Sequence, residues 1–166
     1  KGVSGLKVNV VIYSGSVVVE NRTLVTNGTG VVMITNASKL GIGTYKVLIS
    51  FEGNDYYLAD SKESTIKVSK ANTTVYAPVV IFDQGASEYF EVTVINNANG
   101  KAVKSLPLTI KVYTGSNYKT YSLKTNSSGV AKLNTKALAK GIHKVVISTS
   151  DDCYIVSKSG NLIDIH

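Results

Sequence analysis

Aliphatic and polar residues alternate with a period of two along much of the chain. Between residues 6 and 12 every second residue is Leu, Val or Ile, and the pattern recurs between residues 108 and 112. Such alternation places neighbouring side chains on opposite faces of a half-buried β-strand. It predicts strands at residues 6–13, 17–25, 31–35, 45–51, 64–68, 73–82, 88–95, 108–113, 118–125, 130–134, 143–148 and 161–165.

Turn residues and composition support a chain built of strands. Asn27-Gly28 and Asn99-Gly100 are typical of tight turns. Pro78 interrupts one predicted strand, so we expect that strand to lie at a sheet edge and to change partner there. The chain has 23 Val, 13 Ile and 15 Thr, which favour strands, and no helical period of useful length.

Three stretches of the first seventy residues recur about one hundred residues later. Residues 10–16 match 110–116, residues 26–31 match 125–130, and residues 43–50 match 141–148. Because strands are conserved while loops change length, the separation drifts by one residue from match to match. The chain therefore contains two copies of one unit, and the first copy lacks a counterpart of residues 71–99.

The repeat predicts an all-β fold of two tandem immunoglobulin-like β-sandwich domains. About seven short strands in some 95 residues are typical of this sandwich. We place an N-terminally incomplete domain, lacking its first strands, at residues 1–70, and a complete domain at residues 71–166. Tyr45 and His143 occupy matching positions, where a side chain can close a structural corner by bonding to the backbone. We favour this role for His143 over metal binding or catalysis.

The order of motifs resembles a known repeat family. A Val/Ile strand is followed by Thr-Asn-x-x-Gly-Val, then Gly-Thr-Tyr-Lys-Val at residues 43–47, and Phe-Glu-Gly-Asn-Asp-Tyr-Tyr-Leu-Ala at residues 51–59. It is similar to the tandem immunoglobulin-like repeats of archaeal and bacterial cell-surface adhesin-like proteins, especially those of methanogens. The resemblance implies an extracellular location at the cell surface and a stalk role in cell adhesion. It supplies no catalytic residues and no cofactor.

The charge pattern does not favour nucleic acid as a partner. The net charge is +7, but Arg22 is the only arginine among 18 basic residues, and the lysines are scattered. Arginine is the side chain that best recognises phosphates and base edges. Scattered lysines more often protect strand edges and maintain solubility. No run is long enough and apolar enough for a membrane-spanning helix.

Asparagine sequons indicate a possible glycoprotein. The Asn-x-Ser/Thr pattern fits an exported protein but does not prove modification. The sequons begin at Asn21, Asn27, Asn36, Asn72 and Asn126.

Other residues offer weaker chemistry. The single Cys153 is expected to pack as a small apolar residue. Acidic residues near residues 52–60 and 151–152 could bind Ca²⁺, although solvated loops are the better interpretation. A Lys–Asn isopeptide bond is disfavoured because the strand lysines lie off the apolar face. Tyr56, Tyr57 and Tyr154 could stack on sugars, but we favour a role as plugs at the sandwich ends. We therefore predict no catalytic, cofactor-binding or metal-binding residue.

Three functions remain open, and none is enzymatic. The first is a structural stalk repeat that presents an adhesive region away from the cell and meets adjacent immunoglobulin-like domains. The second is a subunit of a surface filament, in which exposed strand edges of the first domain are completed by neighbouring copies through β-augmentation. The third is a carbohydrate- or cell-wall-binding module whose partners are cell-surface glycans or host proteins.

Overall fold

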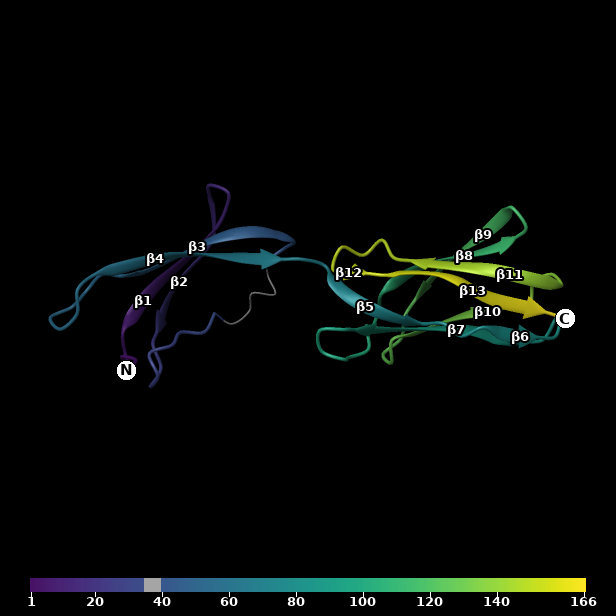
Figure 1. The fold of residues 1–166 in the computed structure, drawn as a ribbon, viewed down its shortest axis with the longest axis horizontal. Helices are drawn as coiled ribbons and strands as arrows, with labels where there is room; N and C mark the ends of the chain where they lie inside the picture. Colours follow the sequence, from purple (N-terminus) through teal and green to yellow (C-terminus); the bar gives the residue numbers. More distant parts are fainter. Residues whose placement is uncertain (35–39) are drawn as a thin grey trace. The chain divides into compact units, whose positions relative to one another are not determined.

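The computed structural model describes residues 1–34 and 40–166, which form two compact units, Lys1–Ser69 (unit 1) and Lys70–His166 (unit 2) (Figure 1). The regular elements of the described residues are all β-strands, so the predicted all-β class is confirmed. The sequence predicts the domain boundary after residue 70.

Unit 1 has a single antiparallel sheet in its described residues. The strand order is β2-β1-β3-β4. Gly15 makes the tight β1–β2 turn with a φ of 60°, a conformation that glycine adopts without steric cost. The strands are β1 (Lys7–Ser14), β2 (Val17–Val25), β3 (Gly43–Phe51) and β4 (Asp60–Val68).

Unit 2 is a sandwich of two sheets. One sheet has the order β10-β7-β5-β12, and the other has the order β6-β13-β11-β8-β9. The second sheet contains the same strand arrangement as unit 1, because β9, β8, β11 and β13 match β2, β1, β3 and β4. The strands are β5 (Ala71–Tyr76), β6 (Val80–Phe82), β7 (Tyr89–Asn96), β8 (Pro107–Thr114), β9 (Asn117–Lys124), β10 (Val130–Asn134), β11 (Gly141–Ser148), β12 (Tyr154–Ile155) and β13 (Ser157–Ile165).

The core of unit 2 lies between its two sheets. Phe90, Val92 and Val94 project from β7 and are fully buried. They belong to one apolar cluster with Ile110 and Val145 from the opposite sheet. This is the interdigitation expected when the apolar faces of two sheets pack together.

Pro78 marks a change of sheet, as its position in the sequence predicted. Before it, β5 pairs antiparallel with β7; after it, β6 pairs parallel with β13. Proline has no N–H to donate to a sheet ladder, so the strand can leave one sheet at this residue and join the other.

The strand predicted at residues 31–35 is not formed in its described part. Residues 31–34 have no strand assignment, and residue 35 lies outside the described residues. In unit 2 the matching strand, β10, pairs with β7. The described part of unit 1 holds no counterpart of β7, so residues 31–34 have the alternation of a strand without its hydrogen-bonding partner.

Candidate functional site

In unit 2 a buried threonine, Thr125, forms two side-chain hydrogen bonds to the segment that leads into β8. We name this arrangement the threonine bracket. The Thr125 hydroxyl donates to the Val103 carbonyl at 2.6 Å and accepts from the Leu106 amide at 2.9 Å. The Thr125 amide also donates to the Leu106 carbonyl at 3.0 Å. One side chain thus satisfies two backbone groups in the segment that leads into β8.

The same bracket is present in unit 1. The Thr26 hydroxyl donates to the Val3 carbonyl at 2.7 Å and accepts from the Leu6 amide at 2.9 Å. The sequence repeat contained both threonines, but nothing in it indicated this hydrogen bonding. Its recurrence shows that the two units share details of backbone conformation as well as strand order.

Replacing Thr125 with valine should destabilise unit 2 by about 2 kcal/mol, because two backbone groups would lose their partner in a buried site. Urea unfolding of the full chain, with hydrogen exchange of the β8 amides, measures the effect. Serine at the same position keeps the hydroxyl and should retain most of the stability. Equal losses for valine and serine would contradict the role of the hydroxyl.

Tyr45 and His143 each bind a carbonyl four residues earlier in the chain. The Tyr45 hydroxyl donates to the Gly41 carbonyl at 2.8 Å. The His143 Nε2 lies 2.7 Å from the Ala139 carbonyl, to which it donates as an N–H. His143 is only 1% exposed, and its Nδ1 lies 3.1 Å from the Tyr113 carbonyl. The two side chains therefore occupy structurally equivalent corners.

Replacing His143 with phenylalanine should cost unit 2 about 1 kcal/mol, because the hydrogen bond from the buried imidazole to the Ala139 carbonyl is lost. Thermal unfolding of the full chain provides the measurement. The neighbouring Ile142 is 65% exposed, so Ile142→Ala is a control that should change stability by less than about 0.5 kcal/mol. A phenylalanine variant as stable as this control would show that the corner bond is dispensable.

The four sequon asparagines within the described residues are all exposed. Asn27 and Asn126 sit in equivalent turns, where the Asn27 side-chain oxygen accepts from the Val31 amide and that of Asn126 accepts from the Val130 amide, both at 3.0 Å. Asn21 lies on β2 and Asn72 on β5. Asn36 lies outside the described residues.

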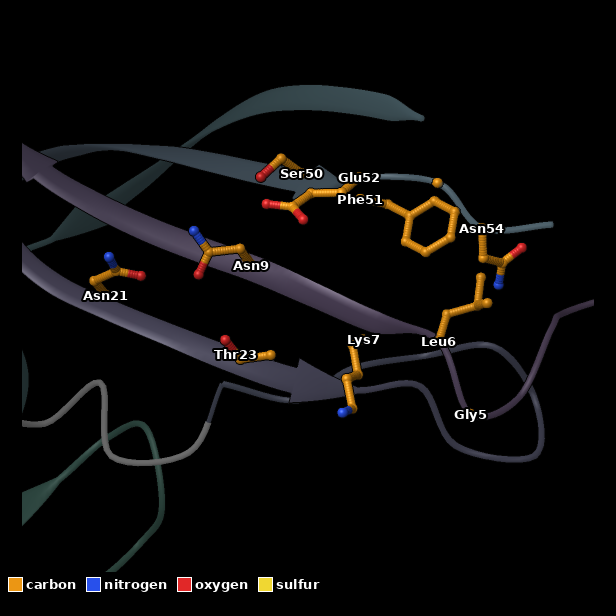
Figure 2. Close-up of a pocket in the computed structure, with 11 residues that line it drawn as sticks. Gly5, Leu6, Lys7, Asn9, Asn21, Thr23, Ser50, Phe51, Glu52 and Asn54 are labelled. Carbon is orange, nitrogen blue, oxygen red and sulfur yellow. The ribbon is translucent and has the colours of Figure 1, made fainter. Parts of the chain in front are cut away.

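Unit 1 carries a shallow hollow of about 660 Å³ at one end of its sheet (Figure 2). Amide, hydroxyl and carboxylate side chains along β1, β2 and β3 line it, while Phe51 and Leu6 lie at its end. Lys7 is the cation in its lining and Glu52 the acid. Such a mixture of hydrogen-bonding groups beside an aromatic ring suits a neutral polar ligand better than an ion.

Two expectations about the late loops are wrong. Tyr56 is 86% exposed and Tyr57 is 45% exposed, so neither ring plugs the end of unit 1. The described residues of unit 1 form one sheet, so no second sheet stands opposite for either ring to seal. Tyr154 is partly buried and packs against the core of unit 2. Cys153 is exposed rather than packed, because its backbone lies in a loop held by the Asp151 carboxylate.

Charged side chains in the described residues pair on the surface. Lys132 on β10 lies 2.5 Å from Glu91 on β7. The hydrogen bond from the Lys132 ammonium to this carboxylate, with their mutual attraction, raises the pKa of Lys132. Within residues 1–34 and 40–166, no three His, Cys, Asp or Glu side chains gather where they could hold a metal ion. The same residues include no helix that is long and apolar enough to cross a membrane.

Comparison with known proteins adds little. No protein-family model matches the chain, and no curated protein matches it significantly. Among solved structures, the chain is similar to one described as the D0-D1 domain of intimin, with 21% sequence identity and a TM-score of 0.38. The match covers 98% of this chain and 83% of that one. At this TM-score the likeness does not establish the fold, which follows from the strands and sheets of the two units.

Proposed function

We propose that the chain is a non-catalytic spacer repeat of a cell-surface adhesin-like protein, holding an adhesive region away from the cell. The observation that carries the proposal is the duplicated sheet: β2-β1-β3-β4 recurs as β9-β8-β11-β13, with the same threonine bracket in each unit. Repetition of one all-β unit extends a chain by a fixed increment, which is what a stalk requires.

The strand pairing of unit 2 suits a load-bearing role. Strand β6 lies near the start of unit 2 and runs parallel to the last strand, β13, with Ile163 opposite Val80 and Ile165 opposite Phe82. Beyond this ladder, the His166 amide donates to the Phe82 carbonyl at 3.0 Å, and the Gln84 amide donates to the His166 carbonyl at 2.9 Å. Because these strands are parallel, tension on the two ends of the unit slides them past each other and loads all of their hydrogen bonds together.

Single-molecule pulling tests the load-bearing role. Attachment through cysteines at Lys70 and His166, in a Cys153→Ser background, shears the β6–β13 pair. Attachment through cysteines at Lys104 and Lys124 pulls apart the open end of the β8–β9 pair, whose bonds then break one at a time. We expect a higher unfolding force in the first geometry, since forced unfolding follows the barrier along the pulling direction. Equal forces, or a lower force through the ends, would count against a stalk.

A glycan-binding module is the second candidate, favoured by the exposed aromatic residues of unit 1. Tyr56 and Tyr57 present their rings to solvent between β3 and β4, and the hollow of Figure 2 offers amides and hydroxyls. Aromatic faces and amide groups are the chemistry with which proteins bind neutral sugars.

A glycan array probed with the intact chain tests this candidate. A sugar that binds the chain should lose roughly two- to tenfold in affinity with Tyr56→Ala, the equivalent of one stacking contact. Tyr118→Ala is the matched control, because Tyr118 is 52% exposed in the other unit. An array without hits, or equal losses in both variants, would remove the glycan hypothesis.

A further inference from the structure

Residues 31–34 of unit 1 are arranged like a strand that lacks its partner. Val32 and Ile34 are partly buried, and Ile34 packs on the apolar cluster of the unit 1 sheet, while Val31 and Met33 face solvent. In unit 2 the matching β10 has the same alternation, with Leu133 buried where unit 1 has Ile34. The difference is that β10 pairs with β7 along its whole length.

The unit 1 sheet is less covered than the matching sheet of unit 2 at two positions of its inner face. Ile49 and Ile66 are only partly buried, whereas their counterparts, Ile147 and Ile163, are buried to about 99% or more. The centre of the face is covered by the unit's own residues, since Ile34 and Leu40 pack there. At Ile49 and Ile66 unit 1 therefore lacks the cover that the sheet with β5 and β7 gives to unit 2, while Val10, Ile12 and Val47 on the same face are buried.

Three backbone hydrogen bonds attach β7 to other segments of unit 2. The Val94 amide of β7 donates to the Gly129 carbonyl, the Val103 amide donates to the Val94 carbonyl, and the Asn96 amide donates to the Lys101 carbonyl, each at 2.9 Å. The equivalent groups in unit 1 are the Gly30 carbonyl, the Val3 amide and the Lys1 carbonyl.

The net charge of unit 1 favours an acidic segment as its partner. Residues 71–99, which form the β5–β7 segment of unit 2, contain three acidic residues and no Lys or Arg, a net charge of −3. Residues 1–70 contain eight basic and five acidic residues, a net charge of +3. A segment with the chemistry of residues 71–99 is therefore complementary to unit 1 in charge as well as in its alternation.

We infer that unit 1 is a receptor for an acidic β-strand pair from outside residues 1–166, with the period-two aliphatic pattern of the β5–β7 segment. The strand equivalent to β7 pairs antiparallel with residues 31–34 and places its aliphatic side chains on the inner face of the sheet. Such strand addition draws affinity from main-chain hydrogen bonds and specificity from alternate side chains. Residues 1–166 hold one such segment, which unit 2 already uses, so a copy that gave it to unit 1 of a neighbour would lose the β5–β7 cover of its own unit 2.

A graft within the full chain tests the inference. A copy of residues 71–100 is added ahead of Lys1. The Gly100 of this copy is joined to Lys1 in the same way as the native Gly100 is joined to Lys101. We expect amide exchange at residues 31–34 to slow by about 100-fold or more, approaching that of β10. The matched control carries Val92→Asp in the grafted copy alone and should leave exchange at residues 31–34 unchanged.

A synthetic peptide of residues 86–99, added to the intact chain, tests strand addition to residues 31–34 if the grafted protein aggregates. Saturating peptide should also slow exchange at residues 31–34, and a peptide of the same composition in scrambled order should not. Unchanged exchange with both the graft and the peptide would overturn the inference. So would light scattering that shows the chain alone to be a dimer with residues 31–34 already protected, because the occupant would then be a second copy.

Discussion

Replacing Phe90 with alanine is expected to lower the stability of unit 2 by about 3–5 kcal/mol, the range for removing a large aromatic side chain from a packed core. Phe90 is 0% exposed and is the largest fully buried side chain of the described residues. The sheets on either side of it are fixed by their ladders, so they cannot close over the cavity. Urea unfolding of the full chain, followed by circular dichroism and by hydrogen exchange in β7, measures the loss.

Tyr89→Ala provides the control for the Phe90 experiment. Tyr89 precedes Phe90 on the same strand, but its side chain is on the opposite face and is 47% exposed. Its replacement should cost no more than about 1 kcal/mol. If the two variants were equally stable, the core of unit 2 would not lie between its two sheets as described.

Gly129→Ala is expected to destabilise unit 2 by about 3 kcal/mol. Gly129 has a φ of +74°, which costs an L-residue roughly 1–2 kcal/mol. A Cβ there would also lie 2.8 Å from the Val94 carbonyl oxygen and 3.0 Å from the Ala102 Cβ. The backbone must shift, which weakens the bond from the Val94 amide to the Gly129 carbonyl and adds about 1 kcal/mol. Thermal unfolding measures the total.

Gly115→Ala measures the cost of the positive φ alone, without a steric clash of the added Cβ. Gly115 has a φ of +60° in the β8–β9 turn, and a Cβ added there meets no atom within 4 Å. This variant should lose only the conformational cost, roughly 1–2 kcal/mol. Equal losses at Gly115 and Gly129 would show that the close approach of β7 to Gly129 contributes nothing to stability.

Much of the architecture follows from local sequence. Period-two alternation predicts the strands because each needs one apolar face, and Pro78 predicts the change of sheet because it cannot donate to a ladder. The repeat relates β1–β4 to sheet strands of unit 2 and predicts that unit 1 has fewer strands. The matched positions of Tyr45 and His143 point to a corner, although the carbonyls that they bind are seen only in the structure.

Tertiary structure alone decides the features that depend on partners distant in sequence. Residues 31–34 and β10 have similar alternation, but only β10 has β7 beside it, because a strand is completed by hydrogen bonds to another segment. Tyr56 and Cys153 are exposed for a similar reason: neither has a sheet or core surface placed against it. Their residue types permitted burial, and the surroundings that the fold supplies determined the outcome.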